Sequence, residues 1–214
     1  MGKETMTTPL PEEKKKIILD LCGGTGSWSR PYKEAGYDVR VVTLPDNDVR
    51  TYKPPKNVYG ILAAPPCDEF SIAKNRDIKR NFKKGMEIVD ACLKIIMTVK
   101  PKWWALENPD GYLKDFIGKT SYTFQPWEYG DPWTKKTRIW GTAKQPKKKY
   151  TKWEDLPKLD LYIRPRRKKP AMASLHKSSQ EKIPQLRKYS VNTDAAFRSI
   201  TPPGFANAFF KANQ

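Results

Sequence analysis

The sequence predicts an α/β fold: a mostly parallel sheet with helices on both faces, together with a small irregular basic segment. Three observations predict it. Short apolar runs alternate with helix-like segments, glycine or proline turns end these runs, and chemically reactive residues follow the turns. Strands that alternate with helices are typical of a doubly wound parallel sheet, which binds ligands at the carboxyl ends of its strands.

The first part of the chain predicts three strands and one helix. Each strand is a short apolar run, as expected of a strand that is buried on both faces. The helix follows a glycine-rich turn, and it tolerates Pro31 because this proline falls near its first turn. We expect strands over residues 17–21, 37–42 and 58–64, and a helix over residues 27–35.

The next part predicts one long helix and three further strands. Apolar residues from Met86 to Val99 fit one wide helical face. The strand after this helix is expected to end at the sequence Glu107-Asn108-Pro109. We expect the helix over residues 85–99, and strands over residues 102–106, near Phe124 and over 138–140.

Composition divides the chain into four segments. Residues 142–190 hold 15 lysines and arginines against 4 aspartates and glutamates, a net +11, with poor periodicity and many prolines. We interpret this stretch as irregular and as ordering at least partly on nucleic acid, although a solvated insertion without a partner is the alternative. The segments are a flexible leader (1–15), a catalytic and cofactor-binding sheet domain (16–141), a basic segment for nucleic-acid recognition (142–196) and a C-terminal helix that returns to the sheet domain (197–214).

The charge of the whole chain favours a polyanionic partner. Its formal net charge is +18 and its pI is about 9.7. Each lysine or arginine that displaces a phosphate counterion adds affinity at modest salt. A basic protein without such a partner is the alternative.

Cysteine and histidine usage predicts free thiols and no bound metal. The three cysteines are scattered and there is one histidine, too few for a disulfide framework or a zinc site. No apolar run approaches the ~20 residues that span a bilayer, and the first 16 residues lack the apolar stretch of a signal peptide. We therefore expect a cytoplasmic protein that does not enter a membrane.

Four motifs carry chemistry, each at or near a predicted strand end. The first, Asp20 to Ser27, has the glycines that permit a tight turn and a close approach of a nucleotide-like ligand to the backbone. Free N–H groups where the next helix begins suit a carboxylate. A tight turn without a ligand is the alternative for this motif.

The other three motifs offer a nucleophile, a carboxylate and cations. Cys67 lies on a turn, where a stabilised thiolate becomes a nucleophile, although a free cysteine is most often a small buried residue. Glu107 can hold or deliver a proton, and an exposed loop glutamate is its alternative. The basic residues of 128–138 can grip a phosphate or a carbonyl oxygen, or belong to a solvated hairpin.

Together, these motifs resemble those of the cytosine-5 DNA methyltransferase family. The segment Asp20 to Ser27 is similar to its cofactor loop, and Pro66 to Ser71 is similar to its Pro-Cys-x-x-Phe-Ser motif. Glu107-Asn108-Pro109 stands where the family has Glu-Asn-Val, and residues 134–138 are similar to its Gln-x-Arg-x-Arg motif. The sequence Thr201 to Ala206 resembles the ending of short, phage-type members.

This resemblance implies a Rossmann-like methyltransferase fold and transfer of a methyl group from S-adenosyl-L-methionine to C5 of a flipped-out cytosine. It implies that Cys67 adds to C6, that Glu107 holds the N3/N4 edge, and that Arg138, helped by Lys136, binds the O2 side. Double-stranded DNA is then the expected partner of a monomeric enzyme. Protection of phage DNA from host restriction is its expected purpose.

The resemblance also implies two sets of binding residues. The expected cofactor contacts are Asp20, Leu21, Cys22, Gly23, Gly24, Thr25, Gly26, Ser27, Trp28, Thr43, Leu44, Asp48, Val49, Pro65, Asn207 and Ala208. The expected DNA contacts are Ser71, Lys147, Lys148, Lys149, Arg164, Arg166, Arg167, Lys168 and Lys169.

Three departures from the family pattern leave alternatives open. The acidic residue for the ribose is replaced in Val42-Thr43-Leu44-Pro45-Asp46, Cys22 replaces an aromatic residue, and the recognition segment is short. A short recognition segment makes few contacts with base edges, which predicts a short target sequence or a relaxed sequence specificity. The alternatives are a nucleic-acid-binding protein of this fold without turnover, an RNA cytosine-5 methyltransferase, and transfer of a larger group.

Overall fold

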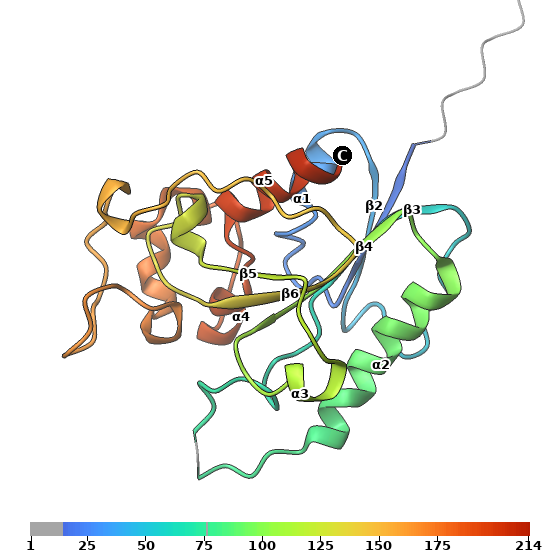
Figure 1. Cartoon of the computed structure of the whole chain (residues 1–214), viewed down its shortest axis with the longest axis horizontal. Coiled ribbons are helices and arrows are strands. Elements are labelled where there is room, and N and C mark those ends of the chain that lie inside the picture. The colour runs from blue at the N-terminus through green and yellow to red at the C-terminus, as the bar shows by residue number, and fades with distance from the viewer. Residues whose placement is uncertain (1–14, 76) are drawn as a thin grey trace, which may run out of the picture.

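A computed structural model describes residues 15–75 and 77–214, so most of the leader predicted over residues 1–15 lies outside the described residues. One six-stranded sheet runs through the molecule in the order β2-β1-β3-β4-β6-β5 (Figure 1). The first four strands in this order are parallel, and β6 runs antiparallel to both of its neighbours, β4 and β5. The strands are β1 (Ile17–Leu21), β2 (Asp38–Val42), β3 (Val58–Ala63), β4 (Trp103–Pro109), β5 (Tyr122–Phe124) and β6 (Thr137–Gly141).

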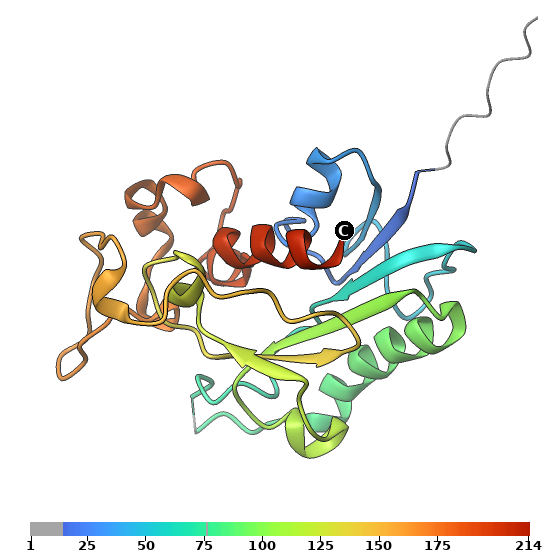
Figure 2. The same cartoon turned by 45° about the horizontal axis from the view of Figure 1, so that its top comes forward.

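Helices cover both faces of this sheet, which confirms the predicted α/β class. Figure 2 shows α1 and α5 on one face, with α2 and α3 on the other. Because the parallel strands are covered on both sides, alternate residues of one strand enter different apolar layers. The helices are α1 (Arg30–Glu34), α2 (Phe82–Val99), α3 (Lys114–Ile117), α4 (Asp194–Ser199) and α5 (Pro203–Asn213).

Two apolar layers form the core of the sheet domain. In β1, Leu19 and Leu21 face the layer beneath α2, whereas Ile18 faces the layer beneath α1 and α5. Aromatic rings dominate the second layer, where Phe124 and Phe205 stack with their centroids 3.7 Å apart. These layers fix the strand ends, which position the site described below.

Three predicted boundaries are wrong for local reasons. The first helix begins at Arg30 instead of residue 27: the glycine turn continues to Ser29, whose hydroxyl donates back to Asp20 and Gly26, and the Ser27 hydroxyl is bound by the N–H of Thr201. The long helix begins at Phe82 instead of Gly85, capped by Asn81, whose side chain accepts from the N–H of Lys84 at 3.0 Å.

The strand predicted over residues 102–106 continues to Pro109. It continues because β6 pairs with it in antiparallel register, Asn108 opposite Arg138 and Pro109 opposite Thr137. Glu107 therefore belongs to a strand rather than to the loop that follows it, and a strand residue is held more rigidly than a loop residue.

The basic segment (142–196) has little regular structure but is packed on its own apolar cluster. Before α4 begins at Asp194, its regular elements are short 3-10 helices, η2 (Trp153–Asp155), η3 (Met172–Ser174), η4 (Lys177–Lys182) and η5 (Pro184–Leu186). The sequence did not predict the cluster, because its members are scattered over loops without a period. They are Trp133, Leu161, Met172, Leu175, Ile183, Leu186, Tyr189, Phe197 and Ile200.

Candidate functional site

The carboxyl ends of β1, β3 and β4 bring three of the predicted motifs side by side. Leu21 pairs with Ala63, and Ala63 pairs with Leu106. Just beyond these pairs, the N–H of Ala64 donates to the carbonyl of Leu21 at 2.9 Å. The glycine loop and the Cys67 loop therefore leave the sheet at the edge where Glu107 lies near the end of β4.

The glycine loop folds tightly over Asp20. This carboxylate is fully buried, and one of its oxygens accepts from the Ser29 hydroxyl at 2.5 Å. A Cβ on Gly23 would lie 2.5 Å from the Asp20 carboxyl carbon, so only glycine fits there. Burial raises the pKa of Asp20 to about 6, against hydrogen bonds from Ser29 that lower it.

Three residues that were predicted to contact the cofactor have side chains that contact other parts of the protein. Trp28 packs between Phe205 and Phe209 in the core, and the Ser27 hydroxyl accepts from the N–H of Thr201 at 2.8 Å. Leu21 is fully buried. These three side chains therefore support the loop and hold it to the C-terminal elements.

The loop after β2 contains the remaining predicted contacts of this region. Asp48 forms an ion pair with Arg50, and its carboxylate also accepts from the backbone N–H of Arg50 at 2.9 Å. Val49 is buried in the core next to it, whereas Leu44 is exposed and Thr43 is half-buried. Leu44 is therefore the apolar side chain of this loop that is free to contact a ligand.

The two residues of α5 that were predicted to contact the cofactor, Asn207 and Ala208, differ in their exposure. Phe205 and Phe209 lie one helical turn apart and are buried, so they define the inner face of the helix. Asn207 lies between them in sequence and is exposed, whereas Ala208 packs partly against the core. Their predicted contacts with a cofactor stay predictions.

The Cys67 loop is tied to the end of β4. The Asn108 side-chain amide donates to the carbonyl of Pro65 at 3.0 Å, and the carbonyl of Cys67 accepts from the N–H of Ser71 at 2.8 Å. A Cβ on Gly111 would lie 2.1 Å from the carbonyl oxygen of Phe70, which shows how closely the two segments approach. Cys67 itself is a partly exposed free thiol.

Glu107 is paired with a lysine that the sequence analysis did not select. The ammonium of Lys135 lies 3.9 Å from a Glu107 oxygen, and both side chains are mostly buried, with 18% and 14% exposed. Burial raises the pKa of Glu107, and the charge of Lys135 opposes that rise. Burial also raises the pKa of the Cys67 thiol; Lys135 opposes this rise, whereas Glu107 and Asp68 add to it.

Arg138 and Lys136 do not reach Glu107 in the structure. Both bind Asp110: the Arg138 Nε donates to one oxygen at 2.7 Å, and the Lys136 ammonium lies 3.2 Å from the other. Residues directly opposite in antiparallel strands share a face, so the pairing of Arg138 with Asn108 places Arg138 opposite to the face of Glu107. Partial burial raises the pKa of Asp110, but the two cations lower it by more, so this pKa lies below its ordinary value.

The strand register explains why Lys135 was missed. Ile139 pairs with Glu107, and Lys135 precedes Ile139 by an even number of residues, so alternation returns it to the face of Glu107. That signal depends on knowing which residue of β6 lies opposite Glu107. The sequence alone does not give this register.

The predicted DNA contacts are largely at the surface. Lys147, Lys148 and Lys149 are exposed, and Lys148 lies 2.6 Å from Glu128. The Ser71 hydroxyl accepts from the N–H of Ala73 at 3.1 Å, at the start of the 71–81 loop. In the second basic run, the exposed residues are Arg164, Arg166, Arg167 and Lys168, whereas Lys169 is half-buried.

Lys169 has a structural contact of its own. Its ammonium lies 5.2 Å from the ring centroid of Trp127 and 5.1 Å from that of Trp153. These cation–π contacts hold the end of the basic run on the protein. The exposed cations that precede Lys169 remain available to phosphates.

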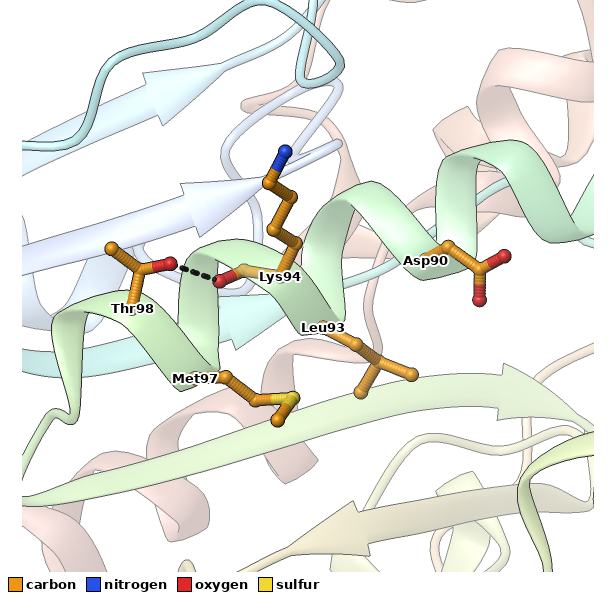
Figure 3. Close-up of a pocket in the computed structure, with 5 residues that line it drawn as sticks. All are labelled: Asp90, Leu93, Lys94, Met97 and Thr98. Carbon is orange, nitrogen blue, oxygen red and sulfur yellow. Dashed lines mark hydrogen bonds between the residues drawn. The ribbon is translucent and has the colours of Figure 1, made fainter.

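A shallow hollow on the outer side of α2 lies away from these motifs. It is lined by Asp90, Leu93, Lys94, Met97 and Thr98, on the turns that lead into the start of β4 (Figure 3). It therefore lies toward the amino ends of the strands.

In the described part of the chain, no helix is long and apolar enough to cross a membrane, and no group of three or more His, Cys, Asp or Glu residues could hold a metal ion.

Comparisons with known proteins find relatives both among known sequences and among solved structures. No family model matches the chain. The chain is 29% identical over 148 residues to the protein named Probable DNA (cytosine-5)-methyltransferase of Frog virus 3 (isolate Goorha), a match that covers 58% of this chain and 69% of that protein. It is 28% identical over 139 residues to the Type II methyltransferase M.DdeI of Desulfomicrobium norvegicum, over 48% of this chain and 32% of that relative.

One of the similar solved structures is described as a "putative DNA modification methyltransferase encoded within prophage" (E. coli). It matches with a TM-score of 0.46 and 15% sequence identity, over 59% of this chain and 46% of that chain. The present chain thus spans about a third of the length of the second curated relative and about half of the solved chain.

Proposed function

We propose, from the premise that this chain belongs to the cytosine-5 DNA methyltransferase family, that it is itself a DNA methyltransferase that acts on C5 of cytosine. One observation carries the proposal. The partly exposed Cys67 follows β3, the mostly buried Glu107 lies near the end of the neighbouring strand β4, and the hydrogen bond from Asn108 to Pro65 joins their segments. A nucleophile and a carboxylate are thereby held at one edge of the sheet.

The two side chains have complementary tasks in the proposed reaction. The Cys67 thiolate adds to C6 of cytosine, which forms a sulfur–carbon bond and moves ring electrons toward C5 and N3. Glu107 holds its proton more readily because burial raises its pKa, and it gives that proton to N3 as charge develops there. After C5 is methylated, a base takes the C5 proton, N3 returns its proton to Glu107, and the ring expels the Cys67 thiolate.

The glycine loop fits a cofactor that carries hydrogen-bond donors. One oxygen of the buried Asp20 has no partner within the described residues, and Gly24, at a φ of +52°, has open space where a Cβ would stand. We propose that Asp20 and residues 22–26 hold S-adenosyl-L-methionine here, next to the exposed Leu44. When bound, this cofactor supplies the methyl group.

The substrate base must leave its duplex to reach Cys67. C5 and C6 are stacked in duplex DNA, and flipping a base costs a few kcal/mol, which phosphate contacts can offset. We propose that the exposed cations at 147–149 and 164–168 make these contacts. Figures 1 and 2 show the basic segment and the described parts of the loop before α2 both to the left of the parallel strands, and we propose that both approach one duplex there.

Nucleoside mass spectrometry tests the proposal. Duplex DNA is incubated with the protein and S-adenosyl-L-methionine and then digested to nucleosides; 5-methylcytosine is the expected product. Cys67→Ser removes the nucleophile and should abolish it, whereas Cys92→Ser should retain it. Unmodified cytosine after treatment with the folded wild-type protein contradicts the proposal. A matched incubation with transfer RNA tests the RNA alternative, and the product mass tests transfer of a larger group.

A nucleic-acid-binding protein of this fold without turnover is the second candidate function. The Asp48–Arg50 ion pair favours it, because it occupies a carboxylate that was predicted to bind the cofactor. Calorimetry with S-adenosyl-L-methionine separates the two candidates. Binding with subsequent methyl transfer supports the enzyme, and its absence supports the binding protein.

A further inference from the structure

Cys22 and Cys92 are in contact although they lie 70 residues apart in the sequence. Their sulfur atoms are 3.9 Å apart. Cys22 directly follows β1, in the glycine loop, and Cys92 lies near the middle of α2. All three cysteines of the chain belong to the described residues, and this is the only pair whose sulfurs are in contact. The fold thus brings two thiols together and leaves Cys67 by itself.

The two thiols differ in their access to solvent. Cys22 is half-buried, and Gly24 and Thr25, which lie just after it on the loop, are exposed. Cys92 is fully buried in the apolar layer beneath α2, against which Cys22 also packs. A reagent in solution therefore reaches Cys22 first, and Cys92 reacts only with a group that is already in contact with it.

We propose that Cys22 and Cys92 form a redox-sensitive dithiol, which a hydroperoxide converts to a disulfide between the glycine loop and α2. This modification does not rest on the proposed function, because it needs neither DNA nor a cofactor. Cys22 stands where the cytosine-5 DNA methyltransferase family has an aromatic residue. The contact with Cys92 gives this departure a chemical consequence.

The oxidation has two steps. The Cys22 thiolate attacks one oxygen of the hydroperoxide, which breaks the O–O bond and leaves a sulfenic acid on Cys22. The sulfur of Cys92 then attacks the sulfur of Cys22: the S–S bond forms, the S–O bond breaks, and hydroxide leaves with the Cys92 proton as water. Overall, the two thiols lose two hydrogens, and hydrogen peroxide is reduced to two molecules of water.

The contact between the sulfurs favours this order of steps. A hydrogen bond from Cys92 lowers the pKa of Cys22, although burial and the charges of Asp20 and Asp48 raise it. The same contact and burial raise the pKa of Cys92, so Cys92 keeps its proton while Cys22 is ionised. Once Cys22 is a neutral sulfenic acid, its negative charge no longer opposes ionisation of Cys92.

The disulfide requires a small movement of the glycine loop. An S–S bond is about 2.05 Å long, so the two sulfurs must approach each other by roughly 2 Å. Gly24 and Gly26, both at positive φ, follow Cys22 and allow the loop to change its backbone angles at little steric cost. Because α2 is a regular helix of 18 residues, we expect the loop to move rather than the helix.

The test treats the folded full-length protein with hydrogen peroxide and maps disulfides by peptide mass spectrometry without reduction. The expected product is a Cys22–Cys92 disulfide within one chain, which dithiothreitol reverses. Protein unfolded in urea is the control, because closing a shorter loop costs less entropy. The unfolded chain should favour Cys67–Cys92, which are 25 residues apart, over Cys22–Cys92, which are 70 apart.

Two serine variants separate the roles of the sulfurs. In Cys92→Ser, the sulfenic acid of Cys22 has no thiol to react with, so dimedone should label Cys22 at least about tenfold more than in the wild type. Cys67→Ser is the matched control, and it should form the Cys22–Cys92 disulfide at a rate within about twofold of the wild-type rate. Circular dichroism establishes that each variant is folded.

Two results overturn the proposal. One is folded wild-type protein whose Cys22 and Cys92 stay reduced at peroxide concentrations that oxidise free cysteine. The other is a folded protein whose disulfides are distributed as they are in urea, which would show that the contact does not select the pair. Where Cys92→Ser does not fold, Cys92→Ala is measured in its place, and the same increase in dimedone labelling is required of it.

Discussion

At the scale of single residues, burial decides which side chains have pKa values that differ from their ordinary ones. Asp131 shows this outside the candidate site. It is 1% exposed and accepts from the backbone N–H of Gly204 at 3.0 Å, which ties the turn after the 3-10 helix η1 (Pro126–Tyr129) to the start of α5. Burial raises the pKa of Asp131 to about 7, although hydrogen bonds from Gln185, Gly204 and Phe205 lower it.

This raised pKa predicts a pH-dependent stability. The folded protein holds the Asp131 proton more tightly than the unfolded chain, so the stabilisation is complete below pH ~4 and is lost as pH rises through ~7. The loss is at most on the order of 4 kcal/mol. Asp131→Asn removes the titration, so its melting temperature should fall less than that of the wild type between pH 5 and 8. Parallel pH profiles of the two proteins contradict this account.

The functional residues could be predicted from the sequence only where local patterns decide their place. Cys67 follows an apolar strand and a proline turn, and such a residue lies at the carboxyl edge of the sheet whatever the rest of the chain does. Lys135 depends on the register between β4 and β6, which tertiary pairing sets. Arg138 was chosen by its place in a motif, whereas its partner Asp110 becomes apparent only from the folded strands.

At the scale of elements, the end of β4 positions the loop that follows β3. Its connection is a buried hydrogen bond from the Asn108 amide to the carbonyl of Pro65, two residues before Cys67. The strand pattern of the sequence predicted both elements, but not that β4 continues to Pro109 and delivers Asn108 to this carbonyl. Pairing with β6 extends the strand, and no apolar period marks that extension.

Replacement of Asn108 tests this connection. Asn108→Ala leaves the buried carbonyl of Pro65 without its donor, which should cost about 1–3 kcal/mol of unfolding free energy. It should also loosen the Cys67 loop and speed proteolysis between residues 65 and 81 in the folded protein. Urea unfolding and limited proteolysis measure the two effects. Wild-type values in both measurements contradict the positioning role of Asn108.

At the scale of the whole molecule, the sheet domain and the basic segment build their apolar cores in different ways. The sheet domain has two continuous apolar layers that the periodicity of strands and helices predicts. The basic segment packs on a third cluster whose members, among them Met172 and Ile183, lie mostly in loops and short 3-10 helices. Such a cluster lacks a period, so it cannot be recognised before the chain is folded. It gives the exposed cations of the basic segment a packed support.

The central claim is that Cys67 bonds covalently to a cytosine in DNA, and 5-fluorocytosine tests it most directly. Fluorine cannot leave C5 as a cation, so a competent enzyme stalls as a covalent adduct when S-adenosyl-L-methionine is present. We predict a denaturation-resistant protein–DNA adduct that Cys67→Ser abolishes and that Cys22→Ser and Cys92→Ser retain. Absence of any adduct with the folded wild-type protein, or an adduct that persists in Cys67→Ser, would contradict the account.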